Sequence, residues 1–189
     1  MKLNNKYYIM RHGQALSNVK NIVSSWPEKF ENQLTDNGRK IVKESAESLA
    51  DKSIDLIFAS PLLRTQQTAE IVGNLLKIKT ETDSRLREID FGVFNGGSGE
   101  KMWESFKSEQ ERIIRGADGG ENYSQVLERM RDFLEETDKK YKGKNILIVS
   151  HEGPLVLLQG KAMGFSLEKT IDNFPPQERI HKSEIRELN

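Results

Sequence analysis

The sequence contains no cysteine and has no excess of either charge. The absence of cysteine excludes disulfides, thiolate nucleophiles, cysteine-ligated zinc and iron–sulfur clusters. Lys and Arg number 29, Asp and Glu also number 29, and the formal net charge is therefore zero. A domain that binds nucleic acid usually carries a basic excess, so we expect no nucleic-acid partner.

Long hydrophobic runs are missing as well. No apolar run approaches the ~20 residues that are needed to cross a bilayer. The four-residue apolar run after Lys6 is too short for the core of a signal peptide. We therefore expect a cytoplasmic protein with no membrane partner.

The apolar residues that are present fall into short runs separated by helical patterns. Residues 54–59 and 145–149 are nearly continuous apolar runs, which are typical of strands buried on both faces of a parallel sheet. Residues 6–10 are β-prone, and residues 182–188 alternate as an edge strand would. Helical periodicity predicts helices over 36–51, 61–76, 122–141 and 153–163.

Capping residues support the first two of these helices. Thr35 is the expected N-cap of the first, and Ser60 the expected N-cap of the second, with Pro61 in its first turn. Alternation of strands and helices over the whole length of 189 residues predicts one domain over 1–189. We expect a three-layer α/β/α sandwich with a mostly parallel sheet.

The stretch 92–120 differs from the rest of the chain, because seven glycines surround a polar helix that bears Trp103 and Phe106. Two interpretations are open: a surface excursion, or a mobile cover over an active site. Glycines at both ends suit the second interpretation, since they absorb changes in backbone dihedral angles.

Basic side chains follow three of the predicted strands. Arg11-His12-Gly13 comes after residues 6–10, Arg64 lies shortly after 54–59, and His151 follows 145–149 by one residue. Ligands of open parallel sheets bind beyond the carboxyl ends of the strands. The pattern therefore predicts two imidazoles and two guanidiniums at one sheet edge.

Such a group of side chains suits phosphoryl chemistry. Arginine forks match phosphate oxygens, and a neutral imidazole is a competent nucleophile. A second, protonated imidazole stabilises the charge of the transferring group. The competing interpretation is a zinc site built from His12, His151 and a carboxylate. The adjacent arginines would repel a divalent cation, and no His-x-x-x-His spacing occurs, so we expect neither metal nor cofactor.

At the level of motifs the sequence resembles the histidine phosphatase superfamily, also called the phosphoglycerate mutase-like family. The matching stretches occur in family order. They are Arg11-His12-Gly13 with Asn18, Leu34-Thr35-Asp36-Asn37-Gly38, Ser60-Pro61-Leu62-Leu63-Arg64-Thr65, Leu86-Arg87-Glu88, Gly119-Gly120-Glu121 and Ser150-His151-Glu152-Gly153.

The resemblance implies a role for six residues. His12 would become the phosphohistidine and His151 would stabilise the transition state, while Arg11, Asn18 and Arg64 would hold phosphoryl oxygens. Glu88 would donate a proton to the leaving oxygen and later accept one from water.

Some positions depart from the pattern of the family. Gln14 and Ala15 stand where many members have Glu and then Ser or Thr, and Glu152 follows the second histidine where Gly is common. In another branch of the superfamily an acidic residue at that place is the proton donor. The donor is therefore either Glu88 or Glu152. Glu88 is favoured because it lies on a loop before the glycine-rich excursion, whereas Glu152 would cap a helix.

The resemblance implies hydrolysis of small phosphomonoesters through a phosphohistidine. One alternative is phosphoglycerate mutase activity, in which a phosphoryl group moves between positions of a small acid. Dedicated mutases carry a longer excursion than the 62 residues, 89 to 150, that separate Glu88 from His151 here. A second alternative is a non-catalytic module that binds a phosphorylated ligand, although such a module typically loses its nucleophile first.

The substrate is expected to be selected by residues 17–31 and 92–120 and by the basic side chains beside them. The candidates are Lys20, Trp26, Arg85, Arg87, Lys101, Trp103 and Arg115. His181 lies outside every motif. The oligomeric state stays open, because an edge strand or an apolar helix face would each suit a dimer.

Overall fold

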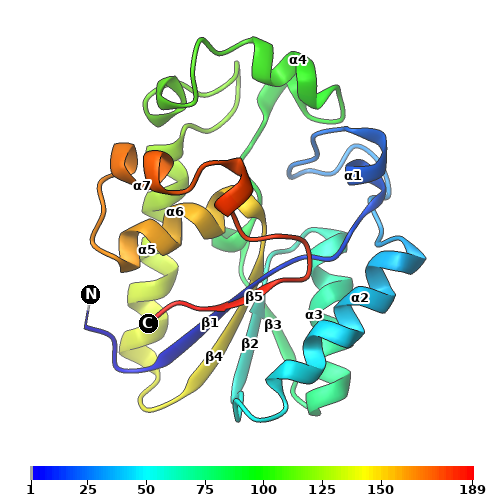
Figure 1. Cartoon of the computed structure of the whole chain (residues 1–189), viewed down its shortest axis with the longest axis vertical. Helices are drawn as coiled ribbons and strands as arrows, with labels where there is room; N and C mark the ends of the chain where they lie inside the picture. Colours follow the sequence, from blue (N-terminus) through cyan, green and yellow to red (C-terminus); the bar gives the residue numbers. More distant parts are fainter. Residues whose placement is uncertain (1) are drawn as a thin grey trace.

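A single five-stranded sheet organises the protein (Figure 1). The computed structural model describes residues 2–189, and the strands are β1 (Lys6–Arg11), β2 (Leu56–Ala59), β3 (Thr80–Thr82), β4 (Asn145–Ser150) and β5 (Ile185–Glu187). Their order across the sheet is β3-β2-β4-β1-β5, and only β5 runs antiparallel, beside β1. The mostly parallel sheet and its terminal edge strand confirm the predicted architecture.

Helices cover the two faces of the sheet and complete the three layers. The helices are α1 (Leu16–Lys20), α2 (Asp36–Ala46), α3 (Leu63–Leu76), α4 (Gly99–Glu104), α5 (Tyr123–Lys140), α6 (Glu152–Ala162) and α7 (Leu167–Asn173). In Figure 1, α2 and α3 lie on one side of the sheet, and α5 and α6 on the other. None of the helices in residues 2–189 combines the length and the apolar character that crossing a membrane requires.

The sheet separates two hydrophobic cores, to which the residues of β1 contribute alternately. Tyr7 and Ile9 belong to the core that includes residues of α5 and α6. Tyr8 and Met10 belong to the core that includes residues of α2 and α3. Since successive strand side chains point to opposite faces, β1 and its neighbour β4 are buried on both sides, as their apolar runs indicated.

Two local predictions need correction. β3 was not predicted, because its three residues are polar and it lies at the edge of the sheet. Helix α3 begins with Leu62 as its N-cap rather than Ser60. By contrast, Thr35 caps α2 as predicted, with its hydroxyl accepting a hydrogen bond from the Gly38 N–H at 2.9 Å.

Residues 92–120 form a separate lobe above the carboxyl ends of the strands, with α4 at the top of Figure 1. The two ends of this segment meet, because the Val93 N–H donates to the Asp118 carbonyl at 3.0 Å. A β-carbon on Gly92 would lie 2.0 Å from the same carbonyl, and Gly92 has φ of +52°, so both space and conformation require glycine there. We call residues 92–120 the excursion.

Candidate active site

Three strand ends bring their polar side chains together. His12 follows β1, and its backbone N–H donates to the carbonyl of Ser150, the last residue of β4, over 3.1 Å. The rings of His12 and His151 stand 5.1 Å apart between centroids, and Arg64, from the first turn of α3 after β2, contacts both rings. We call Arg11, His12, Arg64, Glu88 and His151 the catalytic edge.

The loop after β1 is fixed by close packing against α2. A β-carbon on Gly38 would lie 2.1 Å from the Gln14 carbonyl, and one on Gly13 would lie 2.5 Å from Val42. Glycine at both places lets the backbone after the strand lie directly on the N-terminal turn of α2. The Leu34–Gly38 motif therefore positions the loop that carries His12.

Hydrogen bonds define the tautomer of His12. Its Nδ1 lies 2.7 Å from the Gly13 carbonyl, which only a donor N–H satisfies. Its Nε2 accepts from the Arg64 Nε–H at 3.1 Å and therefore carries the lone pair. Burial, followed by the charges of Arg64 and Arg11, holds the pKa of His12 well below 6.5. His12 is thus a neutral imidazole whose Nε2 lone pair faces the Arg64 guanidinium.

Arg64 connects the two imidazoles although it is almost completely buried, with 3% of its surface exposed. Its Nη2 donates to Nδ1 of His151 at 3.1 Å and to the Ser24 carbonyl at 2.9 Å. Its Nη1 pairs with Glu28 at 3.2 Å, and Glu28 also accepts from the Leu63 N–H at the start of α3. The guanidinium is therefore held in one orientation by both sides of the site.

His151 is also a neutral imidazole in this arrangement. Its Nδ1 accepts from Arg64, so its Nε2 carries the proton and lies 2.8 Å from the Ser60 hydroxyl. The same hydroxyl accepts from the Leu62 N–H at 3.4 Å, so Ser60 connects His151 to the residue that precedes α3. Burial, followed by the charge of Arg64, holds the pKa of His151 well below 6.5.

Glu88 faces the second imidazole from a largely buried position. One of its oxygens lies 3.7 Å from Nδ1 of His151, and its side chain is 13% exposed. Burial raises the pKa of Glu88, while the charges of Arg64 and Arg11 oppose that rise. A carboxyl group with a raised pKa exchanges protons near neutral pH more readily than an ordinary one.

Arg129 of α5 holds the loop that carries Glu88. Its guanidinium donates to the carbonyls of Arg85, Arg87 and Glu88 at 2.6, 2.8 and 3.1 Å. Glu121, from the Gly119-Gly120-Glu121 motif, pairs with Arg129 at 2.9 Å and with Arg87 at 2.8 Å. This motif therefore acts on the site through the position of Glu88.

Glu152 differs from Glu88 in its surroundings. It forms an ion pair with Arg11 and lies 3.7 Å from Arg179, and its side chain is 33% exposed. Arg11 also donates to the Ile180 carbonyl at 3.1 Å. Glu152 is thus bound to two guanidiniums at the rim, whereas Glu88 is buried beside an imidazole.

The other predicted residues are more dispersed. The Asn18 carboxamide oxygen accepts from the Ala15 N–H at 2.9 Å and braces the loop after His12. Arg85 pairs with Asp83 and Glu136, Arg87 with Glu121 and Arg115 with Glu111, and Lys20, Trp26 and Lys101 are exposed. His181 is exposed as well. Of the named candidates for substrate selection, Trp103 lines the cavity described next, and Val23, Met102 and Arg112 from the predicted ranges 17–31 and 92–120 line it as well.

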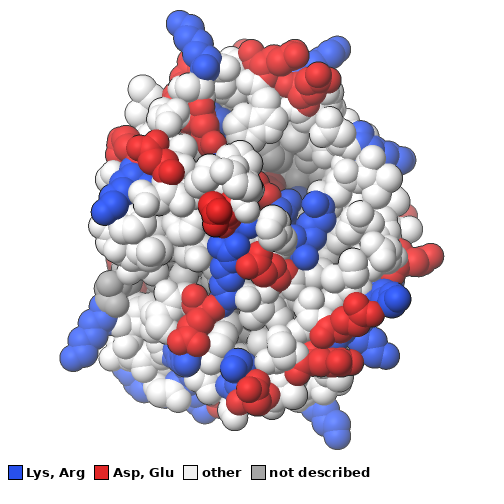
Figure 2. All heavy atoms as spheres, in the orientation of Figure 1, with Lys and Arg blue, Asp and Glu red and all other residues white. Residues whose placement is uncertain are grey.

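A cavity of about 160 Å³ lies between the catalytic edge and the excursion. Arg11, Glu88 and Glu152 line it from one side, and Met102, Trp103 and Arg112 from the other. Figure 2 shows the surface hollowed below the lobe that bears α4, with Lys and Arg atoms at the lower rim. The sequence did not single out Arg112 or Arg179, which also lines this cavity, because neither belongs to a motif or follows a strand.

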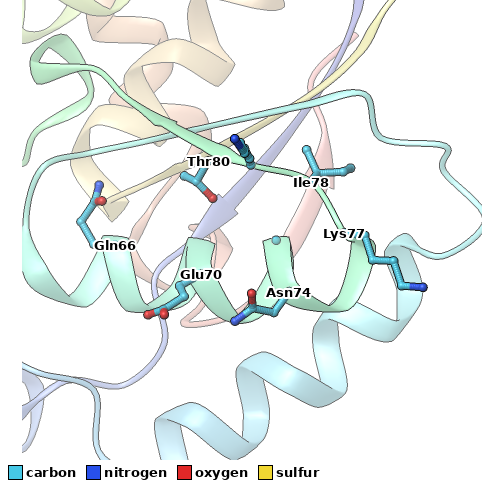
Figure 3. Close-up of a pocket in the computed structure, with 8 residues that line it drawn as sticks. Gln66, Glu70, Asn74, Lys77, Ile78 and Thr80 are labelled. Atoms are coloured by element: carbon cyan, nitrogen blue, oxygen red, sulfur yellow. The ribbon is translucent and has the colours of Figure 1, made fainter.

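A larger groove of about 580 Å³ lies elsewhere, between α3 and the edge strand β3 (Figure 3). Gln66, Glu70, Asn74, Lys77 and Thr80 are among the residues that line it. Its lining contains no histidine or arginine, whereas Arg11, Arg112 and Arg179 line the smaller cavity. Within residues 2–189, no three His, Asp or Glu side chains are grouped as a metal site would require.

Residues 7–183 match the profile of the histidine phosphatase superfamily (branch 1). The chain belongs to the histidine phosphatase superfamily. The matched range includes all the motifs described above, from the strand that precedes His12 to the residues beyond His151.

Relatives of this superfamily member include phosphatases and mutases. It is 27% identical over 169 residues to phosphoserine phosphatase 1 of Hydrogenobacter thermophilus, covering 87% of this chain and 79% of the relative. It is 29% identical over 174 residues to the probable phosphoglycerate mutase GpmB of Yersinia enterocolitica, covering 89% of this chain and 75% of the relative.

Solved structures share the fold of this superfamily member. YhfR of Bacillus stearothermophilus superposes with a TM-score of 0.82 at 23% identity, covering 96% of this chain and 89% of the other. A mycobacterial glucosyl-3-phosphoglycerate phosphatase superposes with a TM-score of 0.81 at 21% identity, covering 95% and 90% of the two chains.

Proposed function

We propose that the protein hydrolyses phosphomonoesters through a phosphohistidine on Nε2 of His12, without a metal ion. The observation that carries this proposal is the state of His12, a buried neutral imidazole whose Nε2 lone pair lies against Arg64. A nucleophile in this state needs no base to activate it. The guanidiniums of Arg11 and Arg64 supply the positive charge that a metal would otherwise provide.

The reaction proceeds in two steps. In the first, Nε2 of His12 forms a bond to phosphorus while the ester oxygen leaves with the proton of Glu88. In the second, water attacks the phosphorus, Glu88 takes its proton, and the bond between Nε2 and phosphorus breaks to release inorganic phosphate. Arg11, Asn18 and Arg64 hold the phosphoryl oxygens, a role that the resemblance assigns to them.

His151 changes its charge during this cycle. The arginines and burial keep its pKa low, but a dianionic phosphoryl group beside Nδ1 favours the imidazolium. Protonation of Nδ1 breaks its hydrogen bond with Arg64, and the new N–H donates to a phosphoryl oxygen as negative charge develops on it.

The nucleophile is tested by trapping the intermediate. Incubation with a radiolabelled phosphomonoester followed by rapid denaturation is expected to leave a phosphoenzyme that is labile in acid and stable in base. His12→Ala is expected to abolish this species and to lower turnover by roughly 10⁴- to 10⁶-fold. His181→Ala is the matched control, because His181 is exposed and lies outside the site. Full activity in His12→Ala would refute the assignment.

Mutase activity is the second candidate, supported by the relative that is a probable phosphoglycerate mutase. Turnover of 3-phosphoglycerate to 2-phosphoglycerate, primed with 2,3-bisphosphoglycerate, is compared with release of inorganic phosphate from the same reaction. We expect phosphate release to dominate. Faster isomerisation than hydrolysis would reverse the order of the two functions. Phosphate binding without turnover of any ester would favour the non-catalytic module.

A further inference from the structure

Arg112 of the excursion is a buried cation in the wall of the site cavity. Only 4% of its surface is exposed, and it lines the cavity together with Arg11 and Glu88. Three aromatic rings enclose its guanidinium, whose central carbon lies 4.7, 5.2 and 4.6 Å from the ring centroids of Trp103, Phe106 and Tyr123. Contacts with aromatic faces fix the orientation of a guanidinium but do not neutralise its charge.

No carboxylate of the described chain forms an ion pair with Arg112. The other arginines around the site all have such partners, since Arg11 pairs with Glu152, Arg64 with Glu28 and Arg179 with Glu109. The buried Nε of Arg112 has no hydrogen-bond partner among residues 2–189. A buried cation without a counterion is costly, so it indicates a place that an anion occupies in function.

The neighbouring polar groups do not supply that anion. Nη1 of Arg112 donates to the Tyr123 hydroxyl at 3.0 Å, and this hydroxyl donates to Glu109 at 2.8 Å. Glu109 is already bound by Arg179, whose Nη2 lies 2.6 and 2.7 Å from its two oxygens. Arg179 also lies 3.7 Å from Glu152, the partner of Arg11. The guanidiniums of Arg11, Arg112 and Arg179 therefore share the two ion-paired carboxylates, which leaves one positive charge uncompensated.

We propose that Arg112 binds a carboxylate of the substrate, so that the protein acts on phosphate esters of small carboxylic acids. This inference rests on the proposed function, because it places the phosphoryl end of the substrate at His12. The planar fork of arginine suits a carboxylate. The cavity of about 160 Å³ is below the ~300–1,000 Å³ typical of sites for drug-sized ligands, which favours a carboxylate over a second, bulkier phosphate.

The other residues that line the cavity indicate which kind of linker joins the phosphate of the substrate to its carboxylate. Val23, Ile89 and Met102 line the same cavity, and its charged residues Glu152 and Arg179 already have ion-pair partners. The atoms between phosphate and carboxylate are therefore offered apolar contacts and few free hydrogen-bond partners. A short carbon chain fits this environment better than a sugar with several hydroxyl groups, which would need hydrogen-bond partners there.

The test compares esters that differ only in the carboxylate. The pairs are 3-phosphoglycerate with glycerol 1-phosphate and O-phosphoserine with phosphoethanolamine, and the quantity compared is the ratio of kcat/KM within each pair. We expect the carboxylate member to be favoured by about 10- to 100-fold, the range for a charged hydrogen bond. Arg112→Gln is expected to bring the ratio close to one, and Arg112→Lys, which keeps the charge, to retain part of it.

A matched control lies in the same excursion. Arg115 also stacks on Phe106, but its side chain is 44% exposed and pairs with Glu111, so Arg115→Gln is expected to leave the ratio unchanged. The inference would be overturned if the ratio of kcat/KM were near one in the natural protein. It would also be overturned if Arg112→Gln lowered kcat/KM equally for both esters of a pair. Preference for a bisphosphate ester over the matching phosphocarboxylate would overturn the choice of carboxylate.

A binding measurement separates this inference from the proposed function. Dissociation constants for the same ester pairs are measured with the His12→Ala variant, in which no turnover is expected. The inference is supported if the carboxylate member of each pair binds more tightly and if adding Arg112→Gln to this variant removes the difference. This holds even if the natural protein hydrolyses none of the esters. Hydrolysis of all four esters without any discrimination in binding would support the proposed function and refute the inference.

Discussion

The catalytic edge and the excursion are built in different ways although they face the same cavity. Arg11 ends β1, and His12 and His151 directly follow β1 and β4. Hydrogen bonds connect Arg64 to both imidazoles. The excursion contains a six-residue helix and short 3₁₀ turns, and its key cation is held by aromatic rings. One region fixes the chemistry at the strand ends, and the other forms the wall against which the rest of the substrate would lie.

This difference predicts that substitutions in the two regions have different signatures. A substitution in the catalytic edge is expected to lower the turnover of every substrate, or to lower it according to the pKa of the leaving group. A change in the excursion is expected to alter the ranking of substrates according to their shape and charge. The predictions below test this separation, from the largest expected effect to the smallest.

Glu88→Gln is expected to give the largest of these effects, because a neutral acid is needed to expel an alkoxide. We expect a decrease of roughly 10²- to 10⁴-fold in turnover of alkyl phosphates. Formation of the phosphoenzyme from p-nitrophenyl phosphate should change little, since that leaving group needs little protonation. The measurement is a series of esters ordered by leaving-group pKa. Glu152→Gln is the matched control, and leaving-group dependence in Glu152→Gln alone would exchange the two assignments.

Trp103→Ala is expected to have a smaller and more selective effect. Trp103 lines the cavity and stacks on Arg112 with its ring centroid 4.7 Å from the guanidinium carbon. Loss of the ring frees Arg112 to move, so we expect kcat/KM for the favoured phosphocarboxylate to fall by about 10-fold. Glycerol 1-phosphate should be affected less. Trp26→Ala is a suitable control, because Trp26 is also an exposed tryptophan, at 50%, and does not line the cavity. Equal decreases for both esters would contradict the separation.

The smallest effect concerns stability in acid. The pKa values of His12 and His151 lie well below 6.5 in the folded protein, so the unfolded chain binds more protons as pH falls below 6.5. The free energy of unfolding should therefore decrease below that pH, by at most about 1.4 kcal/mol per pH unit for each imidazole. Chemical denaturation at several pH values between 7.5 and 5.5 measures this slope.

Variants assign the slope to the catalytic edge. The excursion contains no histidine, so the histidine contribution must come from elsewhere in the chain. His12→Asn and His151→Asn should each reduce the slope. An unchanged slope in both variants would show that the folded and unfolded chains protonate these imidazoles equally, and would contradict their lowered pKa values.

Much of the catalytic edge was predictable because its determinants are local in sequence. Each strand end is marked by an apolar run followed at once by polar residues, as in residues 145–149 before His151. Thr35 was identified as a cap because capping depends on residues within one turn. Ser60 was misassigned as the cap of α3, and its hydrogen bond to His151, 91 positions away, is a contact that no local pattern indicates.

The excursion was predictable only as a segment with unusual composition. Arg112 is distinguished by its contacts with the rings of residues 103, 106 and 123 and by having no ion-pair partner within residues 2–189. No spacing pattern in the sequence indicates either property. Arg179 pairs with Glu109, 70 positions earlier in the chain. Arg115 has a similar place in the sequence, yet it lies on the surface in an i,i+4 pair. Tertiary packing decides which of these cations faces the cavity.

The order of the strands has a consequence for hydrogen exchange and for engineering. β1 and β4 pair over six positions at the centre of the sheet, between β2 and β5, and they carry His12 and His151 at their ends. Amides in such central strands exchange only when the whole domain unfolds, whereas surface segments open locally at much lower free energy. The imidazoles are therefore anchored to the strands whose amides we expect to exchange most slowly, whereas the wall that faces the cavity is built from short helices and turns. Exposed positions of the excursion, such as Val93 and Ile114, can accept substitutions while the strands continue to hold the imidazoles in register.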